Sequence, residues 1–153
     1  MTVQAIPEVY HTLTPYLVVK GAADAIAFYQ KAFDAELLLC LDTPDGGIAH
    51  AELKIGDSII MMCDECPEMG FVSPETLGGA GMSLMLYLED CDKGFQQAIN
   101  AGAQELRPVS DQFYGDRAGT IKDPFGHVWT LGTHIEDVSM DEIKARMAAM
   151  GEN

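Results

Sequence analysis

The sequence predicts an α+β protein built from two tandem βαβββ modules that form a half-open barrel-like mixed sheet, followed by a C-terminal helix. The same order of strand, helix and three further strands occurs twice along the chain. The two predicted helices align at an offset of 68 residues, with Asp24 on Asp92. One helix can cover only one face of a four-stranded sheet, so two modules that curl together bury the faces that each leaves bare.

The first predicted module covers residues 13–63. Pro15 marks the entry to its first strand, because proline cannot donate a hydrogen bond within a sheet. Asp24 can cap the helix, in which Ile26 and Tyr29 recur on one apolar face. The pattern predicts a strand at 13–19, a helix at 25–33 and strands at 37–41, 48–55 and 58–63, with turns at 43–47 and 56–57.

A connector at residues 64–81, with two Pro and four Gly, separates the modules and is a candidate lid over the cavity. The second module covers residues 82–132. Asp90 or Asp92 caps its helix, and Gly102 ends it. The remaining predictions are strands at 82–88, 105–109, 117–122 and 127–132, a loop at 110–114, a type I turn at 123–126 and irregular chain at 133–138.

A C-terminal helix is predicted over residues 140–150. Ser139 and Glu142 form a capping box at its start. Ile143, Met147 and Met150 are spaced to dock on the body of the protein or on a partner chain.

Length and charge restrict the class of protein. A chain of 153 residues is one globular domain over 1–153, or two small halves that share a core. No apolar run approaches the ~20 residues that span a membrane, and the N-terminus lacks a secretory signal, so we expect a cytoplasmic protein. The net charge of −15, from 24 acids and 9 bases, argues against nucleic-acid and membrane partners. An acidic field attracts a small cation, or simply maintains solubility.

The spacing of Cys63 and Cys66 is that of half a zinc site or of a redox pair. A structural zinc site needs four ligands, and Cys40 and Cys91 stand alone in the sequence. A loop follows Cys66 instead of the helix that a redox motif would open. We therefore interpret the spacing as coincidental and expect reduced thiols.

Two strands carry residues suited to catalysis or ligand binding. His50 and Glu52 share one strand face, and a neutral His50 in the cavity could act as acid or base; the alternative is a surface histidine. Asp116 and Arg117 are adjacent and therefore point to opposite faces. Arg117 either clamps an anionic ligand group or belongs to a buried structural ion pair, and Tyr114 could lie at the cavity rim.

The last predicted strand and its continuation add two histidines. His127 and Trp129 share a face, and we interpret Trp129 as core and His127 as structural unless a bulge follows Gly126. His134, with Glu136 and Asp137 after it, suggests either a metal site or an acidic lead-in to the last helix. An apolar lining for a ligand, or an ordinary core, is predicted from Tyr16, Met61, Met85 and Tyr87.

Two sequence motifs resemble the vicinal oxygen chelate superfamily, which includes glyoxalase I, extradiol dioxygenases and bleomycin-binding proteins. They are the helix text AIAFYQKAFDAE and the turn DPFGHVWTL. The longer segment YGDRAGTIKDPFGHVWTLGTHIEDVS resembles its PhnB-like branch. The resemblance covers residues 13–139 and implies paired sheets, an enclosed cavity and a homodimer.

The resemblance also implies a metal site in some members, with one ligand from the first strand and one from the last strand of each module. In this chain those positions hold Thr14, Met61, Ser83 and Thr130. Hydroxyls and a thioether are poor ligands for zinc, nickel or ferrous iron, which take imidazole or carboxylate here. We therefore expect no cofactor, with a divalent metal as the less favoured alternative.

The sequence leaves three functional hypotheses. The first is a small-molecule-binding protein of the bleomycin-resistance type, metal-free and homodimeric, with the ligand between the modules. The second is a lyase, isomerase or transferase that uses His50 with Glu52, Tyr114 and Arg117, with or without a divalent metal. The third is a structural role with a filled cavity. The predicted ligand contacts are Tyr16, His50, Met61, Met85, Tyr87, Tyr114, Arg117 and Thr130.

Overall fold

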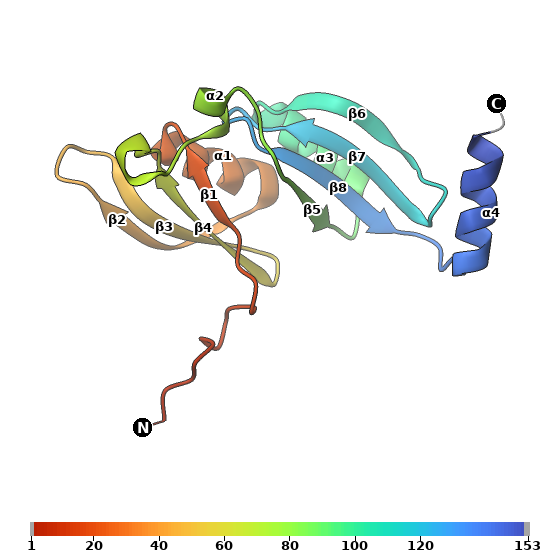
Figure 1. Cartoon of the computed structure of the whole chain (residues 1–153), viewed down its shortest axis with the longest axis horizontal. Helices are drawn as coiled ribbons and strands as arrows, with labels where there is room; N and C mark the ends of the chain where they lie inside the picture. The colour runs from red at the N-terminus through yellow and green to blue at the C-terminus, as the bar shows by residue number, and fades with distance from the viewer. Residues whose placement is uncertain (1, 152–153) are drawn as a thin grey trace.

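The structure, a computed structural model that describes residues 2–151, confirms the α+β class and the two βαβββ modules (Figure 1). The first module contains β1 (Tyr16–Val19), α1 (Ala22–Phe33), β2 (Glu36–Asp42), β3 (Ile48–Ile55) and β4 (Ser58–Asp64). The second contains β5 (Ser83–Tyr87), α3 (Cys91–Ala101), β6 (Gln104–Asp111), β7 (Asp116–Lys122) and β8 (Val128–His134). The connector holds the 3-10 turn η1 (Pro67–Met69) and the short helix α2 (Pro74–Leu77), and α4 (Met140–Met150) ends the chain.

Each module forms one mixed four-stranded sheet with the same topology. The strand orders are β1-β4-β3-β2 and β5-β8-β7-β6, in which the first strand of each module pairs parallel to the last. Over the described residues the two sheets remain separate and do not close into a barrel. The modules lie side by side (Figure 1), and Gln97 of α3 donates to the carbonyl of Lys31 and to Asp34 at the end of α1.

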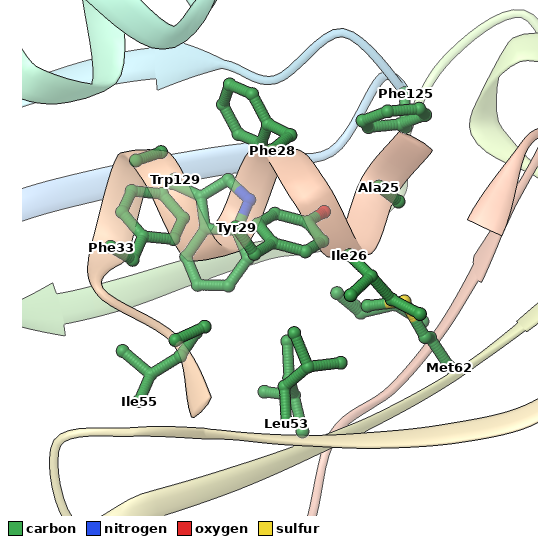
Figure 2. Close-up of a cluster of buried hydrophobic side chains, with 14 of the residues drawn as sticks. Ala25, Ile26, Phe28, Tyr29, Phe33, Leu53, Ile55, Met62, Phe125 and Trp129 are labelled. Atoms are coloured by element: carbon green, nitrogen blue, oxygen red, sulfur yellow. The ribbon is translucent and has the colours of Figure 1, made fainter. Parts of the chain in front are cut away.

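The two modules share one hydrophobic core. Helix α1 buries Tyr29 and Phe33 against Trp129 of β8, with ring centroids 5.6 and 4.8 Å from the indole (Figure 2). Leu53 and Met62, which belong to the first sheet, pack against the side of α1 that faces this sheet. This arrangement confirms Trp129 as a core residue. The second module therefore supplies the largest aromatic side chain in the core of the first.

A buried carboxylate, Asp123, joins the two modules. Its Oδ1 accepts from the backbone N–H of Phe125 and of His127, which closes the predicted turn at 123–126. Its Oδ2 accepts from the Tyr29 hydroxyl at 2.5 Å and from the Trp129 indole N–H at 2.9 Å. Because Asp123 is 2% exposed, its charge is stabilised by these four donors instead of by water. The turn at 123–126 therefore also holds α1 in place, through the hydrogen bond from Tyr29 to Asp123.

The start of α1 differs from the prediction. Gly21 occupies the N-cap position with φ +96°, and Asp24 lies inside the first turn, so the predicted cap at Asp24 is wrong. Asp64, at the end of β4, supplies the acceptor instead: its Oδ1 lies 3.0 Å from the Gly21 nitrogen and 2.7 Å from the Ala22 nitrogen. Its Oδ2 accepts from the Ile48 N–H. The second helix follows the prediction, with Asp90 as its cap.

The hairpin of the second module is longer than predicted. Strand β6 continues to Asp111 and β8 to His134, because both pair with the start of β7. The capping bond of α4 is confirmed, since the Ser139 hydroxyl accepts from the Glu142 N–H. Helix α4 stands clear of the body (Figure 1), and none of its residues 140–150 is buried. No helix within residues 2–151 is long and apolar enough to cross a membrane.

Candidate functional site

A row of side chains crosses the face of the first sheet opposite α1. Tyr16 of β1 is paired with Met61 of β4, which in turn is paired with Glu52 of β3. Residues directly opposite on neighbouring strands project from the same face, so these three side chains lie next to one another. Neighbouring residues such as Leu53 and Met62 point to the other face, into the core below α1.

Four side chains on this face form one hydrogen-bonded chain, which we call the Tyr16–Tyr10 network. The Tyr16 hydroxyl lies 2.9 Å from Nδ1 of His50, and Nε2 of His50 lies 3.0 Å from Oε1 of Glu52. The hydroxyl of Tyr10, from the segment before β1, donates to Oε2 of Glu52. The structure therefore brings together three of the predicted site residues and adds Tyr10.

Burial and hydrogen bonding set the ionisation of this network. The hydrogen bonds from Tyr10 and His50 lower the pKa of Glu52 and outweigh its desolvation, so the carboxylate is ionised although it is only 9% exposed. Burial, followed by the neighbouring Cys63 and by Glu52, raises the pKa of Tyr16 to about 12. Burial likewise raises the pKa of the Cys63 thiol. Tyr16 is therefore a neutral phenol near pH 7, available for hydrogen bonding.

Tyr16 lies between two hollows in the surface. The larger, of about 680 Å³, is lined by residues that include Tyr16, Phe71, Cys63 and Cys66. Acidic side chains join this lining, and Lys20 is the one base among the described residues that line it. A smaller hollow of about 190 Å³ lies against the connector and His127.

The connector forms part of the wall around these hollows. Glu65 accepts hydrogen bonds from Ser73 and Thr76, which fold the chain around α2. Nε2 of His127 lies 3.0 Å from the Val18 carbonyl, consistent with the structural interpretation of this histidine. Cys63 and Cys66 are both free thiols.

The corresponding row of the second sheet is different in chemistry. Met85, Thr130 and Thr120 lie side by side, and the two threonine hydroxyls are 3.1 Å apart. Two residues beyond Met85, Tyr87 is 60% exposed and donates to Asp116. These predicted ligand contacts thus belong to the bare face of the second module and do not join the Tyr16–Tyr10 network.

Asp116 and Arg117 point to opposite faces of β7, as expected. Arg117 forms ion pairs with Asp92 and Asp111. Both carboxylates are exposed, so Arg117 belongs to an ion pair, but not to a buried one. Asp116 accepts from Tyr87 and lies 2.8 Å from Nδ1 of His134. Tyr114 is part-exposed and packs edge-on against Phe113.

The ligand positions of metal-dependent relatives do not fit a divalent ion in this chain. Thr14 lies before β1 and donates to the His11 carbonyl, and Thr130 bonds Thr120. Met61 and Ser83 supply a thioether and a hydroxyl, which are weak ligands for a divalent metal ion. Within residues 2–151, no group of three or more His, Cys, Asp or Glu side chains is arranged to hold a metal.

Sequence reasoning missed Tyr10, because it lies in an irregular segment without periodicity. It also missed that His134 contacts two carboxylates at once, since Asp137 lies 2.7 Å from Nε2 of the same ring. A tyrosine six residues before Tyr16 carries no local signal that it reaches Glu52. The contact depends on the path of the segment before β1, which brings Tyr10 to Glu52.

Comparison with known proteins agrees with this architecture. An uncharacterized protein of Mycobacterium bovis, Mb0911c, is 45% identical over 143 residues, which cover 92% of this chain and 94% of that protein. TioX from Micromonospora sp. ML1 superposes with a TM-score of 0.63 at 26% identity, over 82% of this chain and 99% of TioX. The PhnB protein of Bacillus cereus shares the fold with a TM-score of 0.63 at 21% identity, over 80% and 99% of the two chains.

The sequence profile of one family matches most of the chain. Residues 9–131 match the glyoxalase/bleomycin resistance protein/dioxygenase superfamily. The matched range includes both sheets up to β8 and the whole Tyr16–Tyr10 network. The chain belongs to the glyoxalase/bleomycin resistance protein/dioxygenase superfamily.

Proposed function

We propose that this protein binds a small molecule against the Tyr16–Tyr10 network, without a divalent metal at the positions that hold one in metal-dependent relatives. The observation that carries the proposal is the hydrogen-bonded chain of Tyr16, His50, Glu52 and Tyr10, in which Tyr16 also lines a hollow of about 680 Å³. A few convergent polar groups in an apolar lining are typical of ligand sites. The poor metal donors at Thr14, Met61, Ser83 and Thr130 support a metal-free site.

We also propose that a second copy of the chain completes this site. In one chain the sheet faces opposite the helices are open, and Tyr16 and Met85 are 41% and 44% exposed there. Exposed apolar residues on a sheet face favour burial against another surface. A homodimer that places the first sheet of one copy over the second sheet of the other would enclose a ligand between the rows of Tyr16 and Met85.

Thermal denaturation with a library of small aromatic amines, alcohols and acids tests this function. A ligand that binds only the folded state stabilises it by about 2.7 kcal/mol at 100 times its Kd, which raises the Tm. Compounds that raise the Tm of the wild type should lose their effect in His50→Ala. Gln96→Ala, on the exposed surface of α3, is the matched control and should retain it. Equal Tm increases in His50→Ala would contradict the proposal.

A second candidate is catalysis of proton transfer at the same site. The observation that favours it is a histidine held between a carboxylate and a phenol, the arrangement by which a general acid or base is oriented. Deuterium uptake from D₂O into small carbonyl compounds or thiol conjugates, followed by NMR, tests this activity. Protein-dependent uptake that His50→Ala abolishes is the expected result. Uptake that is unchanged in His50→Ala would exclude this role.

A further inference from the structure

We infer that the protonation state of His50 decides which ligand group Tyr16 binds: a hydrogen-bond donor when the imidazole is neutral, and an acceptor when it is an imidazolium. The inference rests on the proposed function, because it assigns a chemical partner to that same site. It follows from counting the protons that the Tyr16–Tyr10 network can hold.

The count begins at Glu52. An ionised carboxylate only accepts hydrogen bonds, and its Oε2 already accepts from the Tyr10 hydroxyl. The contact of 3.0 Å between Oε1 and Nε2 of His50 therefore requires a proton on Nε2. A neutral imidazole carries one proton, so Nδ1 is then an acceptor with a lone pair. Glu52 thus fixes the tautomer of His50, as carboxylates do for oriented histidines elsewhere.

The tautomer of His50 fixes the direction of the hydrogen bond from Tyr16. Its hydroxyl lies 2.9 Å from Nδ1, so with neutral His50 the single O–H of Tyr16 donates to that nitrogen. The neighbouring Cys63 sulfur is a weak acceptor and does not compete with an imidazole lone pair. Tyr16 then presents only oxygen lone pairs to the hollow. A ligand group that binds there must donate a hydrogen bond, as an ammonium, amide N–H or alcohol does.

Protonation of His50 reverses this polarity. With protons on both ring nitrogens, Nδ1 donates to the Tyr16 oxygen, and the O–H of Tyr16 turns toward the hollow. Tyr16 then binds an acceptor, such as a carboxylate or carbonyl oxygen. The same phenol therefore selects opposite ligand groups, without a change in the backbone.

The surrounding charges act in the same direction. The groups that face His50 and Tyr16 are Glu52 on β3, Tyr10 from the N-terminal segment and Cys63 on β4. Farther into the hollow, Asp45, Asp64, Glu65 and Lys20 contribute two net negative charges. Three backbone N–H groups donate to the Asp64 carboxylate, which holds it in place. With neutral His50 this field favours a cationic donor, so the ligand class is an amine or another polar donor.

Two probes of equal size test the inference. Benzylamine presents a donor cation and benzoate an acceptor anion on the same ring. The ¹⁵N shifts of the His50 ring are first followed with pH to locate its titration midpoint and its neutral tautomer. Each probe is then titrated above and below that midpoint, and the Kd is measured from the amide shifts of β1 and β3.

The expected result is a neutral His50 protonated on Nε2. Benzylamine should bind about tenfold more tightly above the midpoint than below it, and benzoate should show the reverse, since each probe gains a hydrogen bond with Tyr16 in one protonation state of His50 and loses it in the other. Tyr16→Phe retains the charge of His50 and removes only the hydroxyl. In this variant the affinities should still depend on pH through the charge of His50, but the part of the dependence that comes from the Tyr16 hydrogen bond should be lost. Gln96→Ala should behave as the wild type.

The outcomes separate the two claims. A neutral tautomer protonated on Nδ1 would overturn the inference whatever binds. A pH dependence that is identical in the wild type and Tyr16→Phe would overturn the inference and leave the binding function in place. Failure of both probes to shift the signals of β1 and β3 would overturn the proposed function for these ligand classes, and the inference with it.

Discussion

Replacing Asp123 by Asn should destabilise the entire fold, although the side chain differs only by an amide in place of one carboxylate oxygen. Both oxygens of Asp123 accept two hydrogen bonds each, from Phe125, His127, Tyr29 and Trp129. An amide offers one oxygen. With its NH₂ group toward Phe125 and His127, two backbone N–H groups lose their acceptor. With its NH₂ group toward Tyr29 and Trp129, the Tyr29 hydroxyl can accept from the amide, and the indole N–H of Trp129 is left unpaired.

The expected cost follows from this count. A buried donor that is left without an acceptor costs about 1–3 kcal/mol. Each hydrogen bond that remains also falls from the roughly 1.5–3 kcal/mol of a charged acceptor toward the roughly 0.5–1.5 kcal/mol of a neutral one, so the substitution should cost about 2–6 kcal/mol in total. The free energy of unfolding of an ordinary domain is about 5–15 kcal/mol, so Asp123→Asn should lose a large fraction of it. Since Asp123 connects the turn at 123–126 to α1, both modules should unfold together at lower denaturant.

Urea denaturation measures this cost directly. Trp129 is the single tryptophan of the chain and lies 2.9 Å from the Asp123 carboxylate, so its fluorescence reports on the site, and circular dichroism reports on the whole fold. Tyr29→Phe is the matched control, because it removes one hydrogen bond to the carboxylate and leaves no donor unpaired; it should cost about 1.5–3 kcal/mol. The reasoning is refuted if Asp123→Asn costs no more than Tyr29→Phe.

Three further predictions concern other parts of the fold. Met62→Ala removes a fully buried side chain below α1 and should cost about 2–5 kcal/mol in urea denaturation; a cost below about 1 kcal/mol would contradict the packing described. Gly115→Ala should release residues 135–138, because the residue has φ +106° and the new Cβ would lie 2.2 Å from the Glu136 carbonyl oxygen. Hydrogen exchange should show faster exchange of the Ile135 and Glu136 amides, which donate to the Gly115 carbonyl, and unchanged protection there would refute this. The contacts of His134 with Asp137 and Asp116 raise the pKa of its imidazole, so its contribution to stability should be fully present below its ordinary pKa near 6.5 and be lost as the pH rises through the higher value of the folded state. Stability curves of the wild type and His134→Gln against pH should therefore converge toward alkaline pH, and parallel curves would contradict the assignment.

The sequence alone predicted the two βαβββ modules, because each strand, helix and turn of this repeat leaves a local pattern in the sequence. Alternation at residues 48–55 predicted that His50 and Glu52 share a face, and the structure has them hydrogen-bonded. The DPFG turn and the core position of Trp129 also followed from local pattern. The role of Asp123 did not, since two of its four donors come from Tyr29 and Trp129, outside the turn.

Contacts between distant segments lay beyond sequence reasoning. Asp24 was expected to cap α1 because it is close in sequence, but the acceptor comes from Asp64 at the end of β4. The bond between Tyr16 and His50 depends on the register of β1 with β4 and of β4 with β3, which no local pattern encodes. The sequence alone could not decide whether Arg117 binds a ligand or forms an ion pair. The structure decides it, because the start of α3 places Asp92 beside Arg117.

Mapping a bound fragment by NMR tests the central claim most directly. An aromatic amine that binds should shift the amide signals of β1, β3 and β4 around Tyr16, His50 and Met61, and His50→Ala should weaken its binding. The account is contradicted if the shifts instead gather along the groove between α1 and α3, a hollow of about 560 Å³ lined by Lys31 and Gln96, or if His50→Ala leaves the Kd unchanged.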